Sequence, residues 1–94
     1  MVVFYAQNIS EIVVEVRPRG FRVTIVPIYE REGKPVQYYV NKIQFGKGSA
    51  GVLDNYIELY GSMTKNLVAT TFSFKVWRGT IEIDEEKGVM TIYR

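Results

Sequence analysis

Hydrophobic and polar side chains alternate along most of the chain, and the hydrophobic ones are mainly β-branched or aromatic. This period of two is typical of β-strands that have one face in a core and the other in water. Breaks at Gly, Pro and Asn divide the chain into seven candidate strands: residues 2–7, 11–18, 21–31, 36–45, 67–77, 80–83 and 89–93. The pattern therefore predicts a strand-rich domain.

Two candidate strands change phase. In residues 21–31 the apolar face shifts at Pro27, which has no amide proton for a central ladder, so we expect a sheet edge or a β-bulge there. In residues 36–45 the apolar positions pass from 36, 38 and 40 to 43 and 45. Tyr38 and Tyr39 are adjacent and must point to opposite faces.

The middle of the chain has another period. Apolar residues between Ser49 and Gly61 recur at helical spacing, with Ser49 available as N-cap and Gly61 as the C-terminal stop. We expect one helix at about 50–60, and the short connections elsewhere predict antiparallel pairing. The predicted fold class is α+β: one domain, 1–94, with a curved, meander-like antiparallel sheet of about seven strands and the helix packed on it.

Composition favours binding over catalysis. The chain contains no Cys and no His, which removes the usual zinc ligands and the usual general base. Its carboxylates show no buried, unequal pair of the kind that acid–base catalysis uses. We therefore expect no enzymatic activity, no metal and no cofactor. With no basic leader and no apolar run of about 20 residues, we also expect a cytoplasmic protein without a membrane partner.

Cationic and aromatic side chains occur together on the predicted strands, although the net charge is only +2. Three arginines surround one predicted hairpin tip, where they could contact phosphates while a neighbouring aromatic ring stacks on a base. The candidate nucleic-acid-binding residues are Arg17, Arg19, Phe21, Arg22, Tyr39, Lys42, Lys47, Lys75, Trp77 and Arg78. Tyr, Trp and Arg are also enriched at protein interfaces, so a subunit interface is an open alternative.

The segment Gly46–Gly51 fits the pattern G-x-G-x-x-G between a predicted strand and the predicted helix. A dinucleotide site would need a parallel βαβ unit and an acidic residue about 20 positions further on, and the chain supplies neither. The segment is then either a flexible link with a Ser cap or, together with Lys47, a small anion site.

The predicted order of four strands and a helix, with Tyr29-Glu30-Arg31-Glu32-Gly33-Lys34-Pro35 in the turn before the fourth strand, resembles the single-stranded-DNA-binding domains of the positive-cofactor, Whirly and Pur type. The resemblance covers about residues 11–61. It departs from the coactivator pattern at Val26-Pro27-Ile28-Tyr29 and Gln37-Tyr38-Tyr39-Val40, and in the strands after residue 66. It implies a homodimer that holds unpaired strands across curved sheets.

Three functions follow from these observations. The first is a homodimeric binder of single-stranded DNA or RNA. The second is a protein-interaction or structural homo-oligomeric subunit, archaeal or viral, that uses the same aromatic residues. The third is a small anion- or nucleotide-binding regulator that uses Gly46–Gly51.

Overall fold

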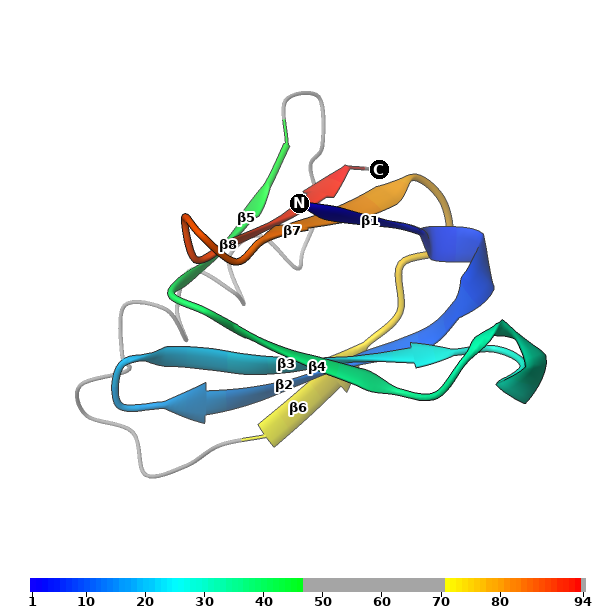
Figure 1. The fold of residues 1–94 in the computed structure, drawn as a ribbon, viewed down its shortest axis with the longest axis horizontal. Helices are drawn as coiled ribbons and strands as arrows, with labels where there is room; N and C mark the ends of the chain where they lie inside the picture. The colour runs from blue at the N-terminus through cyan, green and yellow to red at the C-terminus, as the bar shows by residue number, and fades with distance from the viewer. Residues whose placement is uncertain (47–70, 94) are drawn as a thin grey trace.

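The computed structural model describes residues 1–46 and 71–93, which form eight strands in two four-stranded sheets packed face to face (Figure 1). The terminal sheet has the order β1 (Val2–Tyr5), β7 (Thr80–Asp84), β8 (Val89–Tyr93) and β5 (Lys42–Phe45). The meander sheet has the order β4 (Val36–Val40), β3 (Gly20–Pro27), β2 (Ile9–Arg17) and β6 (Thr71–Phe74). Two 3-10 turns, η1 (Ala6–Asn8) and η2 (Glu30–Glu32), complete the described elements.

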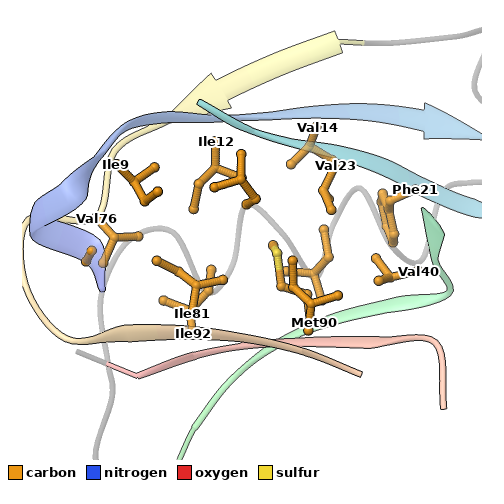
Figure 2. Close-up of a cluster of buried hydrophobic side chains, with 14 of the residues drawn as sticks. Ile9, Ile12, Val14, Phe21, Val23, Val40, Val76, Ile81, Met90 and Ile92 are labelled. Atoms are coloured by element: carbon orange, nitrogen blue, oxygen red, sulfur yellow. The ribbon is translucent and has the colours of Figure 1, made fainter. Parts of the chain in front are cut away.

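The core lies between the two sheets and is built from alternate residues of each strand (Figure 2). Ile12 and Val14 of β2 and Val23 of β3 point from the meander sheet toward Met90 and Ile92 of β8, and all five are fully buried. Each aliphatic side chain of this size contributes about 1.5–3 kcal/mol when it is removed from water. The alternation seen in the sequence is therefore the alternation between core and solvent.

A single residue, Asn41, joins β4 in one sheet to β5 in the other. The backbone carbonyl of Gly88 accepts hydrogen bonds from the amides of Asn41 (2.7 Å) and Lys42 (3.1 Å). On the meander side, a Cβ on Gly20 would lie 2.5 Å from the carbonyl oxygen of Val40. Two glycines thus allow two hairpins to approach the corner at Asn41.

Strand β2 contains a bulge near its start. Ile9 lies opposite Pro27 and Glu11 lies opposite Val26, so Ser10 is the extra residue. The Ser10 hydroxyl donates to the carbonyl oxygen of Val26 (3.2 Å). The predicted irregularity near Pro27 is confirmed, but the extra residue belongs to the partner strand.

The predicted α+β class is wrong. Strands make up 64% of the described residues, and residues 1–46 and 71–93 contain only 3-10 turns and no α-helix. The predicted helix at about 50–60 falls outside the described residues. The single meander-like sheet of about seven strands is corrected to two sheets, because the candidate strand 36–45 breaks at Asn41 and enters both.

Purely antiparallel pairing is also corrected. Strands β5 and β8 pair in parallel, with Ile43 opposite Met90. The short connections predict only the pairs of consecutive strands correctly, namely β2 with β3, β3 with β4, and β7 with β8. The parallel pair joins strands that are far apart in the sequence, so connection length does not constrain it.

The corner predicts a difference between two glycines. Gly20 and Gly33 both have positive φ angles, +140° and +123°, but a Cβ on Gly33 would meet nothing within 4 Å. Substitution of either residue by Ala places a side chain in an unfavourable backbone conformation, whereas only Gly20→Ala also forces a contact with the β4 backbone. We expect Gly20→Ala to lower the free energy of unfolding by about 1–3 kcal/mol more than Gly33→Ala. Urea denaturation of both variants measures this, and equal losses would contradict the steric role of Gly20.

Candidate nucleic-acid interface

The β2–β3 hairpin carries three of the predicted arginines. Arg17 and Gly20 are the last pair of its ladder, and Pro18-Arg19 forms the loop. Arg22 lies two pairs further from the tip, on the outer face of the sheet and directly opposite Glu15. The hairpin therefore presents cationic side chains on both sides of its tip.

Glu15 links two of these arginines. Its carboxylate accepts a hydrogen bond from Nη1 of Arg17 (2.9 Å) and forms an ion pair with Nη2 of Arg22. The hydrogen bonds from Arg17 and Arg22 hold the pKa of Glu15 below its usual value. Glu15 thus partly neutralises the arginine group and fixes the positions of two guanidinium groups on the outer face of the meander sheet.

Tyr39 extends this group onto β4. It lies opposite Arg22 in the β3–β4 ladder, and its side chain is 64% exposed. The pKa of Arg22 is raised above its usual value. The largest cause is a hydrogen bond with Tyr39, and the next is the hydrogen bond with Glu15. Its neighbour Tyr38 points to the inner face, where its ring makes an edge contact with Phe4 (6.0 Å between centroids). The two tyrosines thus face opposite sides, as predicted.

A groove of about 590 Å³ opens between the β2–β3 hairpin and the β7–β8 turn. Arg17 and Arg19 line it on one side, and Glu85 and Glu86 line it on the other. Its remaining lining residues are Pro18, Gly20, Phe21, Tyr39, Val40, Asn41 and Gly88. The groove therefore carries both charges: an arginine rim lies on one side of the corner at Asn41, and a glutamate rim lies on the other.

Phe21 lines this groove, but its side chain is directed into the core. It is 4% exposed and belongs to the core, opposite Val40 of β4 (Figure 2). A ring this deeply buried offers little face on which a base could stack. Tyr39, on the outer face of the next strand, is the aromatic residue that the structure exposes beside the arginines.

The remaining candidates lie elsewhere. Lys42 follows the corner on the outer face of the terminal sheet, opposite Val89. Lys47 and all but the first residue of Gly46–Gly51 fall outside the described residues. Gly46 itself lies against the ring of Tyr93, so close that a Cβ would come within 2.2 Å of it.

Lys75 and Trp77 form a separate group at the other end of the meander sheet, and Arg78 follows them in the connection to β7. The Lys75 ammonium donates to the carbonyl oxygen of Ile9 (3.0 Å) and lies 4.8 Å from the ring centroid of Trp77, which is 77% exposed. Ile9 begins β2 and Arg17 ends it, about 26 Å away at the usual rise per residue. The predicted cationic and aromatic residues are thus divided between two ends of one sheet.

Three polar side chains that line the groove are not among the residues predicted from the sequence: Asn41, Glu85 and Glu86. The phase change between residues 40 and 43 was the available signal for a corner. No local signal places the β7–β8 turn beside the β2–β3 hairpin, because their contact depends on the packing of two sheets.

The chain matches no protein-family model, no curated protein and no solved structure. Among the described residues, no helix is long and apolar enough to cross a membrane. In the same part of the chain, no three Asp or Glu side chains gather in a way that could hold a metal ion.

The ion pairs of Glu15 predict a pH-dependent contribution to stability. Because its folded-state pKa lies below the ordinary value of 4.5, the contribution is present above pH 4.5 and is lost as the pH falls through the folded-state pKa. Glu15→Gln should melt at a lower temperature than the native chain at neutral pH, and the difference should shrink below pH 4.5. Glu11→Gln, on the same face of β2, is the matched control. A difference for Glu15→Gln that stays constant down to pH 2 would contradict the assignment.

Proposed function

We propose that the chain binds single-stranded nucleic acid in the groove beside Tyr39. The observation that supports this most is an aromatic ring, 64% exposed on a sheet face, next to Arg22 and within the same groove as Arg17 and Arg19. Stacking of an unpaired base on such a ring, with guanidinium groups on the adjacent phosphates, is a recurring mode of single-strand binding.

The two rims give the bound strand an orientation. Phosphates are repelled by Glu85 and Glu86, so the backbone of the nucleic acid follows the rim formed by Arg17 and Arg19. The bases then point across the groove, where carboxylates can accept hydrogen bonds from the exocyclic amino groups of cytosine or adenine. The glutamate rim thereby favours bases that carry an amino group.

The alternative function is a protein-interaction or structural subunit. The same pair of opposite rims favours it, because a peptide with both acidic and basic side chains would complement them. Failure to bind any oligonucleotide at low salt would remove the nucleic-acid proposal and leave this alternative.

Fluorescence anisotropy with labelled single-stranded oligonucleotides tests the proposal. We expect binding at low salt, and a slope of log K against log salt of about −2 if three phosphates are contacted. Tyr39→Ala should weaken binding roughly tenfold to hundredfold, since one stacked base contributes about 1–3 kcal/mol.

Tyr29→Ala is the matched control. Tyr29 is also exposed, at 54%, and contacts Arg31, but it lies outside the groove. The Tyr29→Ala variant should therefore bind the oligonucleotides with the same affinity as the native chain. Binding that is indifferent to salt, or equal losses in the two tyrosine variants, would refute the proposal.

A further inference from the structure

The edge strand β1 is only four residues long, but it lacks two other common protections against pairing, charged side chains and proline. Among the described strands its only neighbour is β7. Residues 1–8 contain no charged side chain and no proline, which are the features that commonly keep an edge strand from adding another strand. On its outer face, Val3 is 47% exposed and Tyr5 is 61% exposed. An apolar strand edge is therefore accessible.

The hydrogen-bond pattern shows which backbone groups point outward. The amide of Ala6 donates to the carbonyl oxygen of Gly79 (3.0 Å), next to the Tyr5 and Thr80 pair that ends the β1–β7 ladder. In an antiparallel ladder, successive residues alternate between facing the partner and facing away. Counting back from Ala6, Phe4 and Val2 face β7, while the N–H and C=O groups of Val3 and Tyr5 face the free edge.

A groove of about 320 Å³ runs along this edge. It is lined by Val3, Phe4 and Tyr5 of β1, by residues 32–34 of the β3–β4 connection, and by no residue of β7. Its other lining residues are Asn8, Ile9, Ile25, Pro27 and Val36, most of them on the facing meander sheet. The rim at residues 32–34 carries one carboxylate, Glu32, and one ammonium, Lys34. The edge is thus bounded by a rim without net charge.

We propose that a second copy of this chain pairs with β1 in antiparallel orientation, about a twofold axis at Phe4. In this register Val3 lies opposite Tyr5 of the partner subunit, and Tyr5 lies opposite the partner's Val3. Each of these pairs exchanges both of its N–H···O bonds, as in the hydrogen-bonded pairs of an antiparallel ladder. The outward backbone groups of Val3 and Tyr5 are all satisfied by this pairing.

A second copy fits this edge because the edge is complementary to itself. The two outer-face pairs combine an aromatic with a β-branched side chain, a favourable cross-strand combination. A neutral strand does not repel its own copy. The twofold axis also relates the Glu32 and Lys34 of one subunit to the same two charges on the other, so the rims that approach each other carry no net charge.

Two double variants test the register. In Val3→Lys/Tyr5→Lys, like charges face each other across the axis, whereas in Val3→Lys/Tyr5→Glu opposite charges do. We expect the native chain to be dimeric in sedimentation equilibrium and the second variant to remain so. The dimer dissociation constant of Val3→Lys/Tyr5→Lys should be roughly thirtyfold higher than that of Val3→Lys/Tyr5→Glu. The reason is that two symmetric cross-strand pairs are repulsive in the former variant and attractive in the latter.

Circular dichroism of both variants checks that the two substituted, solvent-exposed positions leave the fold intact. A third variant, Val3→Pro, removes one outward amide without touching the β1–β7 ladder and should also weaken the dimer. A native chain that is monomeric at every concentration would overturn the proposal. Equal dissociation constants for the two double variants would overturn it as well, by showing that any dimer uses another surface.

Discussion

The change of sheet at a single residue, Asn41, determines much of this structure. Because β4 and β5 are separated by one residue, the meander sheet and the terminal sheet must meet at a tight corner. The corner is held by the carbonyl oxygen of Gly88, which accepts from two consecutive amides, and by the close approach of Gly20 to the β4 backbone. Larger residues at either glycine would push a hairpin away from the corner. The two hairpin tips are therefore brought together by the same contact that joins the sheets.

The groove is a consequence of this corner. The β2–β3 hairpin brings Arg17 and Arg19, and the β7–β8 turn brings Glu85 and Glu86, to opposite sides of Asn41. Neither hairpin would form a concave surface alone. Each tip can carry charged side chains because it is a solvated turn, and the packing of the two sheets makes these opposite charges neighbours.

The sequence predicts the strands well because their alternation is local. The alternation in residues 11–18 predicts one buried face, and Ile12 and Val14, which lie on that face, are fully buried. The division into two layers does not follow from the alternation alone. The change of phase in residues 36–45 fits an irregular strand as well as it fits the corner that the structure contains. The parallel β5–β8 pair could not be predicted either, because it brings together segments with no local connection.

The candidate site was predicted in part for the same reason. Arg17 and Arg19 lie in a groove because they sit at the tip of a hairpin that the turn residues predict. Phe21 shares the inward phase of Val23 and is buried like it, so the alternation along the strand indicates its position better than its closeness to the arginines does. The separation of Trp77 from the arginines follows from the antiparallel pairing of β6 with β2, which places the end of β6 at the start of β2.

Strand β4 separates the two proposed binding surfaces. Val36, at its start, lines the apolar groove along β1, whereas Tyr39 and Val40, at its end, line the groove between the rims. The two ends of β4 are about 13 Å apart at the usual rise per residue. A strand added at β1 extends the terminal sheet sideways, at the end of β4 remote from the corner. Self-association through β1 and occupancy of the groove at Asn41 therefore use different residues, and a substitution in one surface leaves the residues of the other in place.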